Sequence, residues 1–235
     1  MTDREHAIRR SRGSLDRETV LSAAVELADA EGLRAITMRR VAQSLGVEAM
    51  SLYHHIPNKE ALLEGLVEAV LREVGEEFSG LSRSRSDGGL ASVRSRCLLA
   101  RDVMLRHPWA PQLINSTPHI PFGAISHYEA ALAELISAGF SYHLGHRALH
   151  ALGSMILGFV QEPFRPSGLE GDAAEDPADS AEFAALMPHL SAMVEAEVHT
   201  TQDRSLGWCD SQAEFEFTLD LLLEGLARRH AGGDT

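Results

Sequence analysis

The sequence predicts an all-α fold, made of a small N-terminal three-helix unit followed by a larger helical domain. Apolar residues recur at three- and four-residue spacings along most of the 235 residues, and no stretch shows convincing strand alternation. Residues 37–60 carry the start, turn and stop signals of two short helices. Residues 79–89 are rich in Gly, Ser and Arg, which is typical of a flexible loop between two parts of a chain.

The first helix is expected from about residue 17 to residue 31, and Gly32 marks its end. Residues that repeat every three or four positions in this segment form one apolar stripe, which should face the core. The stripe consists of Val20, Ala24, Leu27 and Ala28.

Two short helices that meet at a tight turn are predicted within residues 37–60. Thr37 is a suitable N-cap for the first of them, and Gly46 can take the left-handed conformation that ends it. The second helix should begin near Glu48 and stop at Ile56, because Pro57 restricts the residue before it. A helix, a Gly turn and a short helix is the arrangement that places a recognition helix in the DNA major groove.

The second of these helices does not have the composition of a core helix. Leu52 and Ile56 are four residues apart and can pack inward. The remaining side chains suit contacts with phosphates and base edges, although a small helical corner with incidental polar residues would look similar. These outward residues are Ala49, Met50, Ser51, Tyr53, His54 and His55.

Cations flank the predicted recognition helix. Lys59 is the only lysine in the protein, and it follows Asn58, which can cap a third and longer helix. Its ammonium and the free backbone N–H groups at that helix start could meet a phosphate. Arg39 and Arg40 lie on the first helix of the pair, where contacts with the DNA backbone are expected.

Residues 1–14 form an arginine-rich leader with few apolar residues. Such a leader fits a disordered, solubilising tail, and it also fits an arm that settles into the minor groove on binding. The two roles are compatible. The leader and the start of the first helix contain Arg4, Arg9, Arg10, Arg12 and Arg17.

The helix that starts near Lys59 keeps its apolar spacing over several turns, so it should serve both as core and as connector to the next domain. The acidic residues 166–180 are interpreted as a solvated loop. Further helical stretches are expected near residues 91–106, 122–139, 142–162, 181–200 and 211–229.

The last predicted helix is apolar on more than one face. Phe215, Leu219, Leu222 and Leu226 make one stripe, whereas Phe217, Leu221 and Leu223 lie off it. A helix with so wide an apolar surface needs partners on two sides. Burial within one subunit would satisfy it. Alternatively, this helix and residues 151–159 could pair with their copies across a two-fold axis as a four-helix interface.

The net charge of −13 is concentrated outside the N-terminal unit. Residues 1–60 hold nine basic and nine acidic residues, whereas residues 61–235 hold 12 basic and 25 acidic ones. This distribution would help to orient the locally cationic end toward DNA. No apolar run approaches the ~20 residues of a membrane span, and no signal peptide is evident. Cys97 and Cys209 suggest a reduced cytosolic compartment and buried thiols.

A metal or catalytic site is the alternative kind of function. His143, His146 and His150 share one helical face, but no partner ligands are evident, so a wet flank or pocket wall is favoured over a metal site. The sequence has no phosphate-binding Gly-rich loop, nucleophile elbow or convincing carboxylate pair. We therefore expect no enzyme, no cofactor and no metal.

The motifs of residues 15–74 resemble those of the TetR family of transcriptional regulators. The resemblance rests on TVLSAAVELADAEG, AQSLGV and LYHHIPNKEALLEGL, which include Gly46, Val47, Tyr53 and Lys59. The rest of the chain is similar, more loosely, to the C-terminal domain of the tetracycline-repressor branch. The stretches concerned are RHPWAPQL, HYEAALAELISAGF, ALGSMILGFVQE and FEFTLDLLLEGLARR.

The resemblance implies a flexible arm at residues 1–14, a DNA-binding domain at residues 15–75 and an effector-binding and dimerisation domain at residues 76–235. It also implies the contacts with operator DNA. By position these contacts fall on Thr37, Met38, Arg39, Glu48, Ala49, Met50, Ser51, Tyr53, His54, His55 and Lys59.

Among these residues, Tyr53, His55 and Lys59 match the family pattern and should hold phosphates. Ala49 and Met50 replace polar and proline side chains of the tetracycline repressor, and His54 stands at an aromatic position. These positions face the bases, so neither the operator sequence nor tetracycline as the ligand follows from the resemblance.

The family implies a cytoplasmic homodimer that binds double-stranded operator DNA and is released by a small molecule, most naturally a repressor. An activator with the same DNA-binding head is the alternative. The effector is unknown from the sequence, and pocket residues cannot be separated from core residues. Candidate pocket residues are His107, Trp109, Leu113, Phe122, His127, Met155 and Phe159.

Overall fold

The computed structural model describes residues 15–82, 89–159, 181–197 and 211–233, and every regular element within them is helical. The predicted all-α fold is therefore confirmed. The arginines of the leader, Cys209, the acidic residues 166–180 and most of the loop at 79–89 lie outside the described residues.

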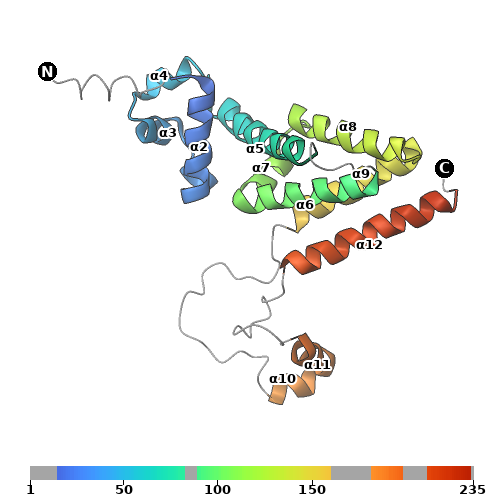
Figure 1. Cartoon of the computed structure of the whole chain (residues 1–235). Coiled ribbons are helices and arrows are strands. Elements are labelled where there is room, and N and C mark those ends of the chain that lie inside the picture. Colours follow the sequence, from blue (N-terminus) through green and yellow to red (C-terminus); the bar gives the residue numbers. More distant parts are fainter. Residues whose placement is uncertain (1–14, 83–88, 160–180, 198–210, 234–235) are drawn as a thin grey trace.

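Figure 1 shows a small head formed by α2 to α4, a connecting helix α5, and a helical body in which α12 lies along one side. The elements are α2 Arg17–Glu31, η1 Leu33–Ala35, α3 Met38–Leu45, α4 Ala49–Tyr53, α5 Lys59–Ser82, α6 Leu90–Arg106, α7 Ala110–Ser116, α8 Phe122–Ser137, α9 Tyr142–Gly158, α10 Ala181–Leu186, α11 Pro188–Glu197 and α12 Ser211–Ala231.

The head is held together by the apolar face of α2. Its predicted stripe is buried, and Leu21 on the same helix packs toward α5. A Cβ atom on Gly65 would lie 2.4 Å from Leu21 Cδ2, so the glycine allows α5 to approach α2 closely. The start of α2 is capped by the Asp16 side chain, which accepts a hydrogen bond of 2.8 Å from the Thr19 N–H.

Helix α5 joins head and body without interruption. Its apolar residues continue the core of the head into the body, where Val103, Met104, Trp109 and Leu113 belong to the same buried cluster. The expected domain boundary after residue 75 falls inside this continuous helix, so the division into two domains stays a prediction.

A second buried cluster holds the body together. It joins α6, α8, α9 and α12, with Phe215 and Leu219 fully buried. On α12, Leu223 is buried and Leu222 is only half-buried, which reverses their predicted places. Phe217 is 62% exposed and Leu221 is 49% exposed, so an apolar face of α12 points away from this subunit. No helix in the described ranges is both long enough and apolar enough to span a membrane.

Candidate DNA-binding head and effector cavity

The turn between α3 and α4 has the geometry that its sequence predicts. Thr37 caps α3 by accepting a hydrogen bond of 3.2 Å from the Arg40 N–H. Gly46 has φ +68° and ψ +30°, in the left-handed region. A side chain there would strain the backbone, although a Cβ atom would meet nothing within 4 Å. The turn therefore depends on the conformational freedom of this glycine.

Helix α4 is shorter than predicted. It spans Ala49–Tyr53, with Glu48 as an extended N-cap residue, and does not continue to Ile56. The chain makes one further turn, in which the N–H groups of His55 and Ile56 both donate to the Leu52 carbonyl at 2.9 and 2.8 Å. Leu52 and Ile56 are buried as expected, and these two anchors fix which side of α4 faces outward.

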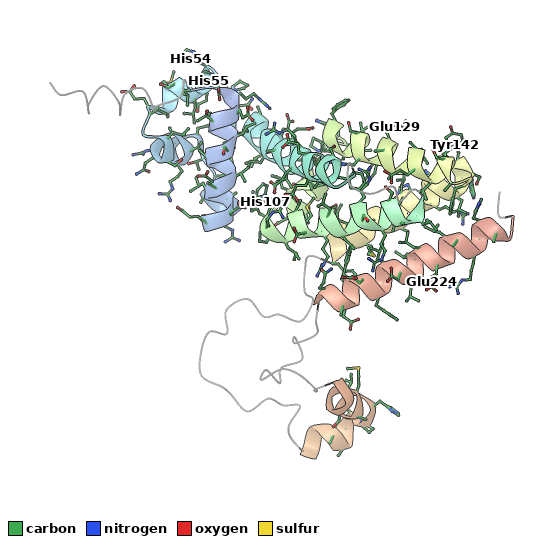
Figure 2. All side chains as sticks on the ribbon, viewed as in Figure 1. His54, His55, His107, Glu129, Tyr142 and Glu224 are labelled. Atoms are coloured by element: carbon green, nitrogen blue, oxygen red, sulfur yellow. The ribbon has the colours of Figure 1, made fainter. Side chains whose placement is uncertain are left out.

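The outward side of α4 carries the predicted contact residues. Met50 is 69% exposed and Tyr53 is 45% exposed, so both side chains are open to contact from outside the head. His54 is exposed and His55 is half-buried, and Figure 2 shows both on the outer edge of the head. Ala49 and Ser51 are half-buried at the flanks, and Thr37, Arg39, Glu48 and Lys59 are exposed.

Met38 and Arg40 make contacts within the head that the sequence did not predict. Met38 is 8% exposed and belongs to the buried cluster of the head, so its side chain does not face outward. The reason is its place on the same face of α3 as Val41 and Ala42. Arg40 is exposed like Arg39, and it forms a surface ion pair with Glu31 at the end of α2.

Lys59 is the exposed first residue of α5 and follows α4 closely in the chain. Asn58 precedes it, and the Asn58 Oδ1 accepts a hydrogen bond of 2.8 Å from the Ala61 N–H, as its N-cap position predicts. The cap fixes the direction in which α5 begins, and so it sets the position of the Lys59 backbone relative to α4.

An apolar chamber lies inside the body, between α5, α6, α7, α8 and α9. Its volume is about 110 Å³, and its walls include Leu71, Cys97, Met104, Ile114 and Ala131. Burial raises the pKa of the Cys97 thiol to about 12, so this thiol stays protonated and acts as an apolar wall residue. A more polar outer chamber of about 580 Å³ shares Tyr128, Leu149, Gly153 and Leu157 with it.

His127 is a polar residue in the wall of the inner chamber, and its surroundings determine its tautomer and its protonation. Its Nε2 lies 2.7 Å from the Leu71 carbonyl oxygen, which can only accept, so Nε2 carries the proton. Burial lowers the pKa of His127 and outweighs the opposing effect of that hydrogen bond. The ring is therefore neutral near pH 7, and its Nδ1 is a hydrogen-bond acceptor.

The structure places the seven candidate pocket residues in different environments. His127 lines the chamber. Phe122 is 76% exposed, and Met155 and Phe159 pack in or against the core of the body. The remaining candidates, His107, Trp109 and Leu113, lie at the junction of head and body. Sequence reasoning missed Cys97, Met104 and Ala131 as wall residues, because an apolar residue beside a cavity has no sequence signal that differs from core.

The histidine face on α9 is on the surface. His143, His146 and His150 are exposed, and the rings of His146 and His150 meet edge to face with centroids 4.6 Å apart. His146 and His150 also line the outer chamber, so they form part of a pocket wall. Within the described ranges, no three His, Cys, Asp or Glu side chains gather in a way that could hold a metal ion.

Two family models match the chain. One, described as "Bacterial regulatory proteins, tetR family", matches residues 20–66. The other, described as "Tetracyclin repressor-like, C-terminal domain", matches residues 90–230. The first match covers the recognition helix, and the second covers α6 to α12 almost completely.

Individual relatives agree with these models. The tetracycline repressor protein class A of Escherichia coli is 32% identical over 92% of each chain. A helix-turn-helix transcriptional regulator of Saccharopolyspora erythraea is 32% identical over 64% of this chain and 60% of its own length. The crystal structure of TetR from Acinetobacter baumannii AYE, 26% identical, covers 92% of this chain and 99% of its own, with a TM-score of 0.64.

Proposed function

Because this chain belongs to the TetR family of bacterial regulatory proteins, we propose that it represses transcription from a palindromic operator and is released by a small molecule. Membership makes it a ligand-responsive DNA-binding regulator and not an enzyme. The observation that carries the proposal is the outward face of α4, where Met50 and Tyr53 stay exposed while Leu52 is buried. We assign it to the cytoplasm, where operator DNA is found.

The exposed residues divide into two roles in the operator complex. Tyr53, His55 and Lys59 bind phosphates, which fixes the head on the duplex. Ala49 and Met50 contact base edges, together with Glu48, Ser51 and His54. The small side chain of Ala49 and the apolar side chain of Met50 suit contact with a thymine methyl group more than bidentate hydrogen bonding. Thr37 and Arg39 reach the DNA backbone from α3, where Met38 can contribute only its backbone.

A second copy of the chain completes the operator-binding unit. The exposed Phe217 and Leu221 on α12 form an apolar face that a single subunit leaves uncovered. Pairing of α9 and α12 with their copies would bury this face and would relate the two heads by a two-fold axis. The heads could then enter successive major grooves, about 34–36 Å apart.

The chambers set the chemistry of the effector. The inner walls are almost wholly apolar. Arg96 is paired with Glu134 at 2.8 Å, although its buried Nε–H has no hydrogen-bond partner among the described residues, so a neutral effector with an acceptor group suits this wall better than a charged one. The neutral His127 offers an acceptor. We infer an uncharged, mainly apolar effector that presents a hydroxyl or N–H group to His127 and its polar end to the outer chamber. Typical coupling of ~1–3 kcal/mol would weaken operator binding several-fold to about a hundredfold.

The operator assignment is tested by replacing Lys59 with Ala. The probe is a duplex carrying the site that the wild-type protein selects from a random-sequence library. Removal of one phosphate contact should weaken binding at least ~10-fold and reduce the dependence of log Kd on log salt by about one ion. Kd is measured by fluorescence anisotropy at several salt concentrations.

The matched control is Arg72→Ala, which removes one positive charge from the part of α5 that lies beyond the head, where the side chain is 50% exposed. This variant should bind the operator like the wild type, and both variants should remain dimers on a sizing column. Equal Kd values and salt slopes for all three proteins would refute the placement of Lys59 at the DNA.

A further inference from the structure

A buried histidine joins the head to the body. His107 is 6% exposed and lies at the end of α6. Its Nδ1 is 2.8 Å from Oδ1 of Asp29 on α2, and its Nε2 is 3.1 Å from Oε2 of Glu73 on α5. A single ring thus contacts a carboxylate from the head and a carboxylate from the connecting helix. Figure 2 shows His107 where the body meets the head.

The neighbouring groups show which way the protons point. Trp109 donates its Nε1–H to the same Asp29 oxygen at 2.6 Å, so that oxygen is an acceptor. Arg106 donates to the other carboxylate, at 2.6 Å to Glu73 Oε1, and also pairs with Glu77 and Asp102. Burial opposes ionisation of Glu73, but the hydrogen bonds from Arg106 and His107 prevail and lower its pKa. Glu73 is therefore an anion near pH 7.

Both ring nitrogens of His107 accordingly face acceptors. A neutral imidazole has one N–H and one bare lone pair, so it could satisfy only one of the two carboxylates. The other contact would then set lone pair against lone pair at a buried ring, although the Asp29 and Glu73 side chains are 32% and 35% exposed. The doubly protonated imidazolium donates to both and also balances part of the negative charge of Asp29 and Glu73.

We propose that His107 is a positioning residue that, in its protonated form, locks the head against the body in the placement that binds the operator. Loss of that proton leaves the ring able to donate to only one of Asp29 and Glu73. The link from α2 through the ring to α5 is then broken, and Asp29 keeps the hydrogen bond from Trp109. Operator binding therefore depends on pH through His107, in addition to any contribution from His54 and His55 at the DNA. This inference rests on the proposed operator-binding function.

The test compares His107→Gln with the wild type on the selected operator duplex, at constant ionic strength because DNA binding depends on salt. Gln can donate to one carboxylate but carries no charge. Its Kd should exceed that of the wild type about tenfold at about pH 6, since a charged hydrogen bond is lost, and the ratio should fall toward one by about pH 9. The contributions of His54 and His55 are common to both proteins and cancel in this ratio.

His119→Gln is the matched control, because the His119 side chain is 69% exposed and its Nε2 lies 3.8 Å from Glu64 Oε1, too far for a hydrogen bond. Its ratio should stay near one at both pH values. Asp29→Asn is the second variant, for use if His107→Gln does not fold. It keeps His107, and its Kd ratio to the wild type should show the same trend with pH but be smaller. If the ratio of variant Kd to wild-type Kd does not change with pH for His107→Gln and Asp29→Asn, the proposal is overturned.

A second measurement needs no DNA. Ring ¹⁵N spectra of the histidine-labelled dimer, with His107→Gln used for assignment, should show both His107 nitrogens protonated at about pH 6. A neutral His107 at about pH 6 would refute the lock even if operator binding is observed. Failure of the wild type to retain any DNA would instead refute the proposed function, so the two failures can be told apart.

Discussion

At the scale of single residues, the account depends on which side chains are buried and which are not. Leu52 and Ile56 anchor α4, and this leaves Met50 and Tyr53 exposed. Gly46 makes that arrangement possible by taking φ +68° between the two helices. Burial also decides the chemistry of Cys97 in the body, because it keeps the thiol protonated in the wall of the inner chamber.

Cys97 provides a prediction at this scale. Its pKa is raised to about 12, so almost no thiolate exists at neutral pH, and thiolate is the reactive form. In a Cys209→Ser variant, the remaining thiol should react with an aromatic disulfide reagent at least ~100-fold more slowly in the native protein than in urea. Stopped-flow absorbance measures both rates. Comparable rates in the two conditions would show that the chamber wall is open to solvent at Cys97.

At the scale of elements, helix termini were predictable from sequence because they depend on neighbouring residues. Thr37, Gly46 and Asn58 act as the cap or turn residues that their positions indicated. Pro57 as a stop signal predicts a longer α4 than the structure has, because the helix ends at Tyr53 and the chain makes one further turn before Ile56. The chambers could not be predicted, since they arise where five helices meet and their walls look like core in sequence.

The helices around the inner chamber provide a second prediction. Ala131 on α8 lines the chamber, whereas Ala133 on the same helix is exposed. Leu at position 131 would fill part of the ~110 Å³ void, so Ala131→Leu should reduce effector affinity at least ~10-fold and leave operator affinity unchanged. Ala133→Leu should affect neither quantity.

The measurement is isothermal titration of each variant with an effector found by its ability to release the selected operator. Unchanged effector affinity in Ala131→Leu would place the effector elsewhere. The same chamber contains Met104 and Ile114, which flank His107 along the chain. An effector that shifts this corner between α6 and α7 would therefore act on the contact with Asp29 at the same time.

At the scale of the whole molecule, the charge distribution and the exposed apolar surface both favour a dimer that approaches DNA with its heads. Residues 1–60 are neutral overall, and the −13 charge belongs to residues 61–235. The acidic part would keep the body away from DNA and favour approach by the head, within a Debye length of ~8 Å at physiological salt. The exposed apolar face of α12 then supplies the surface by which two copies present two heads.

Selection of DNA by the wild-type protein from a random-sequence library tests the central claim most directly. Two heads related by a two-fold axis should enrich a palindrome whose half-site centres are about 10 base pairs apart. An Ala49→Gln, Met50→Gln double variant should enrich a palindrome of the same spacing with different bases. Enrichment of no sequence, or of an isolated half-site or a direct repeat, would contradict the account.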